Sequence, residues 1–204
     1  MTPPSALDLT PLPRSFYARP VLVVARACIG KLLVHHTKEG LTVGRIVETE
    51  AYRGPEDRAA HSFGGRRTAR TEVMFGPPGH AYIFFVYGMH FQFNIVTTRA
   101  GDPHAVLVRA VEPVLGVDLM AERRGLPEQS RELTSGPGKL CQAFAIGKAD
   151  YGADLCGSRL FLSNGPRVKI QSSPRIGVQY AEDWAKKPWR FFDPKSRYVS
   201  RARP

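Results

Sequence analysis

A single arginine inside an apolar run constrains the fold of this chain more than any other residue. Residues 105–114 read AVLVRAVEPV, an almost wholly apolar stretch that is typical of a buried β-strand, and Arg109 interrupts it. A buried guanidinium without a partner costs at least several kcal/mol, even after relaxation. The fold must therefore place a carboxylate, carried by a neighbouring segment, beside Arg109.

The candidate partners of Arg109 are carried by residues 41–52, LTVGRIVETEAY, which read as a long strand paired in a hairpin with residues 31–36. Residues two apart in a strand face the same side, so Glu48, Glu50 and Tyr52 share one face. An arginine neighbour favours the ionised form of a carboxylate and suits it to act as a base. Two simpler interpretations stay open, namely a solvent-exposed acidic face and a purely structural ion pair.

The rest of the pattern predicts one α+β domain. Two aromatic and β-branched runs, 81–87 and 90–98, predict a second hairpin with Tyr87-Gly88-Met89 at its tip. Residues 1–15, rich in Pro and Ser, are expected to form a flexible N-terminal arm or a segment wrapped on the surface, followed by a single domain over 16–204. Helices are expected over 21–30, 116–125, 139–146 (with Ser135 or Pro137 near its start) and 181–187. One or two helical turns are expected over 55–63, and short strands over 159–165 and 168–173.

The net charge predicts a polyanionic partner. Lys and Arg number 29 against 18 Asp and Glu, which gives a formal charge of +11 and a pI near 10.0. This balance favours nucleic acid over an acidic membrane surface, with a solvated surface of mixed charge as the simpler alternative. Basic residues cluster at 66–70 and after residue 185, in both cases near aromatic residues that could stack on bases or anchor the core. The candidates for phosphate contact are Arg66, Arg67, Arg70, Lys139, Lys186 and Lys187.

The cysteine and histidine spacing gives no support for a metal or a disulfide framework. Three cysteines, Cys28, Cys141 and Cys156, lie far apart in sequence, which suits a reducing compartment. We find no H-x-x-x-H, H-E-x-x-H or C-x-x-C spacing, no signal peptide and no transmembrane run. The expectation is a cytoplasmic, nucleoid-associated protein without a metal or cofactor.

Three further features allow either a functional or a structural interpretation. His61 could belong to a site or to the surface, and residues 135–139, SGPGK, could contact a phosphate or cap a helix. Tyr87 at a hairpin tip could wedge between stacked bases, or the tip could fold back onto the core.

Taken together, these segments resemble the alkyladenine (3-methyladenine) DNA glycosylase family, the type without a helix-hairpin-helix motif. The matching segments occur in the family's order between Ala27 and Phe192, and they read RIVETEAYRGPEDRAAHS, YGMHFQFNI, LVRAVEP, SGPGKLCQA and WAKKPWRF. Several separated motifs in the same order are far more specific than any one of them. The expected fold is a single α+β domain with a mostly antiparallel, curved, partly open barrel-like sheet, flanking helices and a protruding hairpin.

The resemblance implies a role for each matching residue. Glu50 matches the family's catalytic carboxylate, a general base on water, and Arg109 matches the arginine that helps to hold it. The base pocket would comprise Tyr52, His61, Phe84 and Asn94, and the residues inserted into DNA would be Tyr87 and Met89. Phe84 stands where the family often has Tyr, and His90, Gln92 and the loop 97–104 also depart from it, which affects the expected substrate range more than the activity.

The predicted function is that of a monofunctional DNA glycosylase in base excision repair. It would flip alkylated purines (3-methyladenine and 7-methylguanine, with hypoxanthine and ethenoadenine as further candidates) out of double-stranded DNA. A Glu50-activated water would then hydrolyse the N-glycosidic bond and leave an abasic site. We expect a monomer. The alternatives are a non-enzymatic minor-groove DNA-binding protein and a nucleoside or glycoside hydrolase acting on small substrates, the second of which leaves the charge unexplained.

Overall fold

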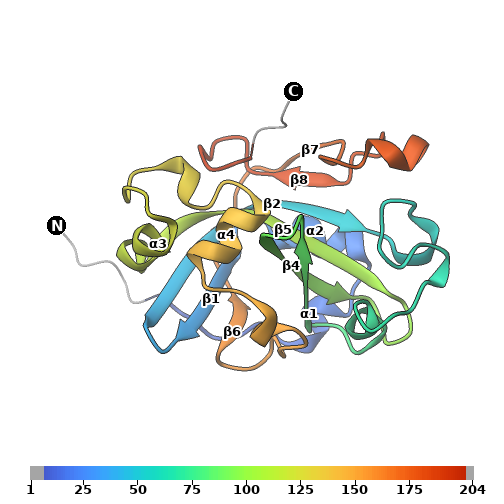
Figure 1. The fold of residues 1–204 in the computed structure, drawn as a ribbon, viewed down its shortest axis with the longest axis horizontal. Coiled ribbons are helices and arrows are strands. Elements are labelled where there is room, and N and C mark those ends of the chain that lie inside the picture. Colours follow the sequence, from blue (N-terminus) through green and yellow to red (C-terminus); the bar gives the residue numbers. More distant parts are fainter. Residues whose placement is uncertain (1–6, 201–204) are drawn as a thin grey trace.

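Two long antiparallel strands, β2 (Gly40–Tyr52) and β5 (His104–Leu115), form the centre of a curled sheet in the computed structural model, which describes residues 7–200 (Figure 1). The sheet order is β3-β4-β5-β2-β1-β6. The edge of β2 that pairs with β1 over residues 40–45 pairs with β8 over residues 48–50, and β7 pairs with β8. All of these pairings are antiparallel. The remaining strands are β1 (Leu32–Thr37), β3 (Ala81–Val86), β4 (His90–Thr97), β6 (Leu160–Ser163), β7 (Gln171–Ser173) and β8 (Arg190–Phe192).

Few and short helices complete the domain, and the predicted single-domain α+β class is confirmed. The α-helices are α1 (Arg14–Tyr17), α2 (Val21–Cys28), α3 (Val117–Arg124) and α4 (Pro137–Ala143). The 3-10 turns are η1 (Gly54–Glu56), η2 (Phe63–Gly65), η3 (Glu72–Phe75), η4 (Arg131–Leu133), η5 (Lys148–Asp150) and η6 (Gln179–Trp184). No helix among residues 7–200 is long and apolar enough to cross a membrane.

Two predicted elements need correction, and one strand was not predicted. The helix expected over 139–146 begins at Pro137, as expected, but ends at Ala143 because Ala145 adopts a positive φ of 52°. The segment expected as a helix over 181–187 is the 3-10 turn η6, in which Glu182 has non-helical angles. The strand β8 was not predicted, because its three residues are too few to show a period.

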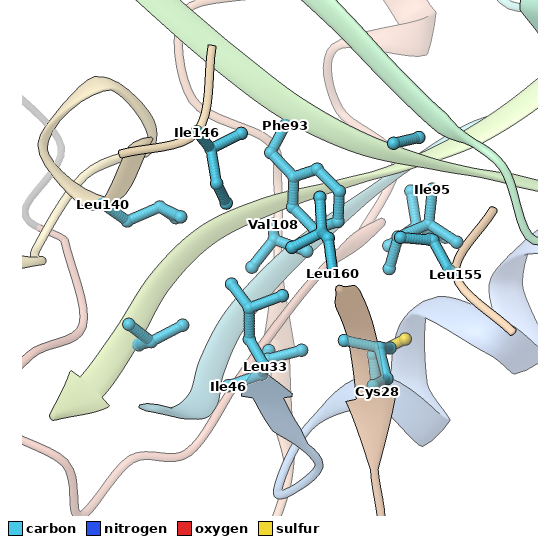
Figure 2. Close-up of a cluster of buried hydrophobic side chains, with 14 of the residues drawn as sticks. Cys28, Leu33, Ile46, Phe93, Ile95, Val108, Leu140, Ile146, Leu155 and Leu160 are labelled. Atoms are coloured by element: carbon cyan, nitrogen blue, oxygen red, sulfur yellow. The ribbon is translucent and has the colours of Figure 1, made fainter. Parts of the chain in front are cut away.

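The two faces of the sheet are used differently. Alternate residues of β2 to β5, together with α2 and α4, bury one continuous apolar core, in which Phe93, Ile95 and Val108 lie between Leu140 and Cys28 (Figure 2). The intervening residues of these strands lie on the opposite face of the sheet. Tyr82, Asn94, Leu107 and Glu50 are successive cross-strand partners, so they form one row across β3, β4, β5 and β2. The strand period therefore gathers the predicted site residues on the face away from this core.

The segment before α1 packs along β6. The Leu12 amide donates to the Leu162 carbonyl at 2.8 Å, Pro11 bridges to Ser163, and Leu12 is buried. A wrapped surface segment, one of the two expectations for this stretch, therefore describes it from Asp8 onward. Residues 1–6 of the expected arm lie outside the described residues, and a domain boundary at residue 15 stays a prediction.

Candidate active site

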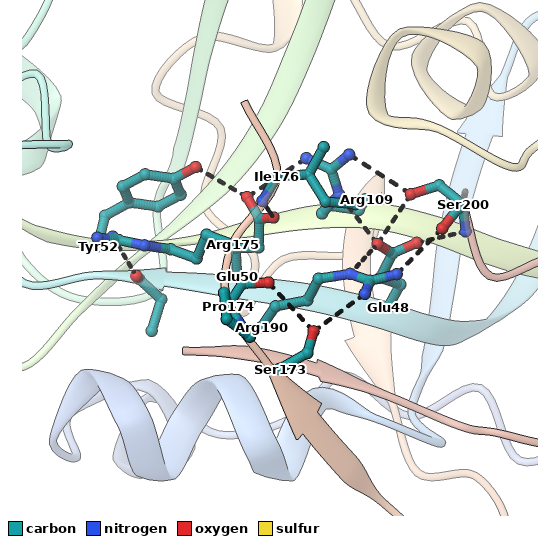
Figure 3. Close-up of polar contacts among 11 residues, drawn as sticks. Glu48, Glu50, Tyr52, Arg109, Ser173, Pro174, Arg175, Ile176, Arg190 and Ser200 are labelled. Carbon is teal, nitrogen blue, oxygen red and sulfur yellow. Dashed lines mark hydrogen bonds and ion pairs between the residues drawn. The ribbon is translucent and has the colours of Figure 1, made fainter. Parts of the chain in front are cut away.

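Paired bulges bring Arg109 to the carboxylates of β2. Glu48 pairs with Ala110 and Thr49 with Val108, so Arg109 has no partner of its own in the register. A bulge of this kind bends a strand and redirects a side chain. The Arg109 Nε donates to Glu48 Oε1 at 3.0 Å and its Nη1 to Glu50 Oε2 at 3.3 Å (Figure 3). The ion pair expected from the apolar run is therefore present, and the exposed-face interpretation of Glu48 and Glu50 is wrong.

Glu50 is enclosed by three donors. Besides Arg109, the Tyr52 hydroxyl donates to Oε2 at 2.8 Å and the Ile176 amide donates to Oε1 at 2.8 Å (Figure 3). The residue is 0% exposed. Burial and the charge of Glu50 raise the pKa of Tyr52 well above its ordinary value, so its hydroxyl stays protonated and keeps donating. Burial would lower the pKa of Arg109, but the charges of Glu50 and Glu48 outweigh it and raise that pKa.

Glu48 is held by a second network that includes the C-terminal segment. Its Oε1 accepts from Arg190 Nε at 2.7 Å and from Ser200 Oγ at 2.8 Å, and its Oε2 accepts from the Ser200 amide at 2.6 Å. Glu48 is also 0% exposed. Arg109 thus links two carboxylates. One is Glu48, which is bound to Ser200 at the end of the described chain, and the other is Glu50, the predicted catalytic residue.

Arg175 and Asp57 form a further ion pair beside Glu50, which the sequence did not reveal. The Arg175 Nη1 and Nη2 atoms donate to the two Asp57 oxygens at 2.5 and 2.9 Å, and both side chains are fully buried. The Arg175 guanidinium also lies 4.8 Å from the Tyr52 ring centroid. The two residues are 118 positions apart, and neither lies in an apolar run that would signal a buried charge.

The predicted base-pocket residues adjoin the row of site residues. The His61 Nδ1 lies 2.8 Å from the Tyr82 hydroxyl, and the ring meets Phe84 edge-on at 4.5 Å between centroids. The side-chain Nδ2 of Asn94 donates to the Tyr82 backbone carbonyl at 3.2 Å. Burial of the His61 ring, then the charges of Arg70 and Arg66, lower the pKa of His61 to about 4, although the residue as a whole is exposed.

A small cavity adjoins His61. It measures about 90 Å³ and is lined by His61, Arg66, Thr68, Arg70 and Thr71. The Arg70 guanidinium lies 4.8 Å from the Phe84 ring centroid. The basic cluster at 66–70 therefore borders the predicted pocket.

The hairpin tip projects into solvent. Tyr87 is 84% exposed and Met89 67% exposed, and Tyr87 has a positive φ of 54°. The Met89 amide closes the tip by donating to the Val86 carbonyl at 3.2 Å. Of the two interpretations of the tip, the one in which it folds back onto the core is wrong. His90, at the base of the tip, packs against Gly138 of α4, where an added Cβ would lie 3.0 Å from the His90 ring.

Several of the basic residues expected at phosphates already have partners within the protein. Arg67 pairs with Glu72 at 2.5 Å, Lys186 pairs with Asp183 at 2.8 Å, and Lys139 pairs with Glu132. Lys187 lies over the rings of Trp184 and Trp189, 4.9 and 5.5 Å from their centroids. Trp189 and Phe191 pack against the core, so these aromatics act as anchors. No group of three or more His, Cys, Asp or Glu residues in the described chain could hold a metal ion.

Comparison with known proteins places the chain in a family. The family model described as "Methylpurine-DNA glycosylase (MPG)" matches residues 15–197. A protein of Desulfitobacterium hafniense is 50% identical over 93% of this chain and 98% of its own length. A protein of Methanocella arvoryzae is 50% identical over 95% of this chain and 97% of its own length. A protein of Clostridium acetobutylicum is 42% identical over 92% of this chain and 96% of its own length. All three carry the name "Putative 3-methyladenine DNA glycosylase". The chain therefore belongs to the methylpurine-DNA glycosylase family, hydrolases that act on N-glycosyl bonds in DNA.

Proposed function

We propose that this protein removes alkylated purines from double-stranded DNA by hydrolysis at Glu50 and leaves an abasic site. The observation that carries the proposal is the fully buried Glu50 carboxylate, fixed by Arg109, Tyr52 and the Ile176 amide in one cross-strand row with Asn94. A carboxylate fixed in this way in a protein of formal charge +11 suits a substrate whose phosphates are anionic and whose reacting sugar becomes cationic.

Glu50 has the capacity for the proposed chemistry. Each carboxylate oxygen can accept two hydrogen bonds, and Oε2 already accepts from both Tyr52 and Arg109. From the described residues Oε1 accepts one, from the Ile176 amide, so it can still accept a water. As the glycosidic bond lengthens, the ionised carboxylate both stabilises the oxocarbenium-like sugar and deprotonates that water. The reaction needs no amine nucleophile, and we propose a monofunctional enzyme without a cofactor.

Access to Glu50 requires that the nucleotide leave the duplex. Rotating it out costs a few kcal/mol of unstacking and unpairing, and Tyr87 would fill the space it vacates, with Met89 beside it. The 84% exposure of Tyr87 on a projecting hairpin supports this role. Base flipping by this hairpin also explains why a large aromatic occupies an exposed turn.

The pocket chemistry favours electron-poor bases. The ring faces of Tyr52 and Phe84 would attract a positively charged purine such as 3-methyladenine or 7-methylguanine. Neutral lesions such as hypoxanthine and ethenoadenine need help at the leaving group, and Phe84 offers no hydroxyl for it. Asn94 would discriminate against the 2-amino group of normal guanine. We propose a monomer acting on nucleoid DNA in the cytoplasm, with Arg66 and Arg70 near the phosphates of the flipped nucleotide.

The test is a panel of duplexes, each with one defined lesion, incubated with the wild type and with Glu50→Gln. We expect release of 3-methyladenine and 7-methylguanine by the wild type and a loss of at least about 100-fold in the variant, with duplex binding retained. Full activity of Glu50→Gln would refute the assignment. Binding without excision by the wild type would instead favour a non-enzymatic minor-groove protein. Borohydride trapping of a covalent adduct would contradict the monofunctional mechanism.

A further inference from the structure

We propose that Arg175 is a positioning residue that acts on the reaction through Glu50, with Asp57 as its anchor. The inference rests on the proposed role of Glu50. It concerns neither substrate contact nor overall charge, because the Nη1 and Nη2 donors of Arg175 are directed at Asp57 and at two backbone carbonyls.

One guanidinium joins the segments that surround Glu50. The Arg175 Nη1 donates to the Ala51 carbonyl at 2.9 Å, next to Glu50 in β2. Its Nη2 donates to the Trp184 carbonyl at 3.1 Å, at the end of η6. The bidentate contact with Asp57 adds the loop that leads to His61, because the Asp57 carboxylate also accepts from the amides of Arg53 and Ala59 at 3.1 and 3.0 Å.

The next residue in the chain makes the link to Glu50. The Ile176 amide, which donates to Glu50 Oε1 at 2.8 Å, belongs to the peptide that follows Arg175 directly. A displacement of Arg175 therefore moves the donor that orients Oε1, the oxygen with capacity for a water. Tyr52, which fixes Oε2, lies with its ring centroid 4.8 Å from the Arg175 guanidinium (Figure 3). The Trp189 ring centroid lies 5.2 Å from the same guanidinium. Arg175 thus supports the donors of both Glu50 oxygens.

The chemistry of the pair explains why the residue is arginine. A planar guanidinium can bond both Asp57 oxygens and two carbonyls at once while its face packs on an aromatic ring. A lysine keeps the charge but is a point donor without that plane. Lysine at position 175 would therefore preserve the ion pair and release the backbone around Ile176. This difference separates positioning from charge balance.

The experiment measures single-turnover release of base from a duplex that carries one 7-methylguanine, with enzyme in excess, together with the affinity for that duplex. Under these conditions the rate constant reports folded, bound molecules, so partial unfolding does not mimic the effect. For Arg175→Lys we expect a rate constant lower by about tenfold, with the Kd changed by less than about threefold. Asp57→Asn, which weakens the anchor, is the second variant and should give the same split between rate and affinity.

Arg45→Lys is the matched control. Arg45 also lies on β2 and pairs with two carboxylates, those of Glu112 and Asp193, with its side chain 15% exposed, but it is outside the Glu50 contacts described above. We expect a lower Tm for this control and an unchanged rate constant. A rate constant for Arg175→Lys and Asp57→Asn within about threefold of the wild type, or a parallel loss of rate and affinity, would overturn the inference. Equal rates for the wild type and Glu50→Gln would instead refute the proposed function, so the two failures are distinguishable.

Discussion

Each of the two carboxylates of β2 is held by its own set of donors, and Arg109 is common to both. Glu50 accepts hydrogen bonds from Tyr52 and from the Ile176 amide, whereas Glu48 accepts hydrogen bonds from Arg190 and Ser200. Burial removes the hydration of these charges, so each must be compensated by a protein donor. The arrangement leaves Glu48 as the structural carboxylate and Glu50 as the candidate for chemistry.

This division predicts a large stability effect at Glu48. Glu48→Gln leaves Arg190 without a buried counter-charge and leaves Arg109 with Glu50 as its carboxylate partner, and we expect the free energy of unfolding to fall by about 3–5 kcal/mol. Glu112→Gln is the control, because its side chain is 38% exposed, and it should cost less than about 1 kcal/mol. Urea denaturation of both variants measures the difference. Equal losses in the free energy of unfolding would show that Glu48 contributes no more to stability than the exposed Glu112.

His61 predicts a pH dependence of stability. Its folded pKa of about 4 lies below the ordinary value of 6.5, so between these values the unfolded chain binds more protons. Its contribution to stability is therefore full above pH 6.5 and is lost as the pH falls toward 4. In His61→Gln, proton uptake on unfolding near pH 5.5 should be smaller than in the wild type by up to about one proton. Calorimetry in buffers of different ionisation enthalpy measures this uptake, and identical uptake in both proteins would contradict the assignment.

At the scale of elements, the β3–β4 hairpin combines a strained backbone with an exposed ring. Tyr87 adopts a φ of 54° that non-glycine residues rarely take, and Gly88 follows with 67°. Strain of this kind persists where the surroundings impose it, and it often marks a functional position. Here the hairpin register fixes the backbone and the ring is left in solvent.

Two substitutions separate the strain from the function of the hairpin. Tyr87→Ala removes the ring and keeps the strained backbone, whereas Tyr87→Gly removes both, so Tyr87→Gly should be more stable than Tyr87→Ala by about 1 kcal/mol. Both should lose base excision by at least about tenfold, and Tyr87→Phe should retain it. Thermal unfolding and lesion release measure the two effects. Retained excision in Tyr87→Ala would remove the wedge from the mechanism.

At the scale of the whole molecule, the formal charge of +11 already counts the carboxylates, and the internal ion pairs decide which of the 29 basic residues are left to meet DNA. Arg67, Lys139 and Lys186 each pair with a carboxylate, so the count of basic residues overstates the charge available to DNA. Arg66 and Arg70, which line the cavity beside His61, remain the candidates closest to the predicted pocket. We therefore expect the electrostatic part of the affinity for DNA to come from contacts with a few phosphates.

The salt dependence of duplex binding tests this conclusion. Contact with about four phosphates predicts a log–log slope near −3.6 and a loss of affinity of roughly 100-fold between about 50 and 200 mM salt. Arg66→Gln should make the slope shallower by about 0.9, and Lys186→Gln, at a residue already paired, should leave it unchanged. Fluorescence anisotropy with an undamaged duplex measures the slope. Salt-independent binding would favour a hydrolase of small substrates.

The local sequence predicted the parts of this protein that depend on neighbouring residues. The period of two in β2 and β5 placed Glu48, Glu50 and Tyr52 on one face, and the Arg109 interruption demanded their proximity. The predicted end of the 139–146 helix was wrong and β8 was not predicted, because a positive φ and a three-residue strand depend on tertiary contacts.

By itself the sequence determined the charge, the strand faces, the existence of the hairpin and the family to which the chain belongs, whereas the structure decided that the hairpin tip projects. Only the tertiary structure decided how Glu50 is held. The Ile176 amide is 126 residues from Glu50, and Arg175 is 118 from Asp57. The bulge that redirects Arg109 is a matter of register between two strands. The physical reason is that a buried charge requires donors at fixed distances, whereas a linear pattern specifies which face a residue takes and leaves open which distant backbone amide will meet it.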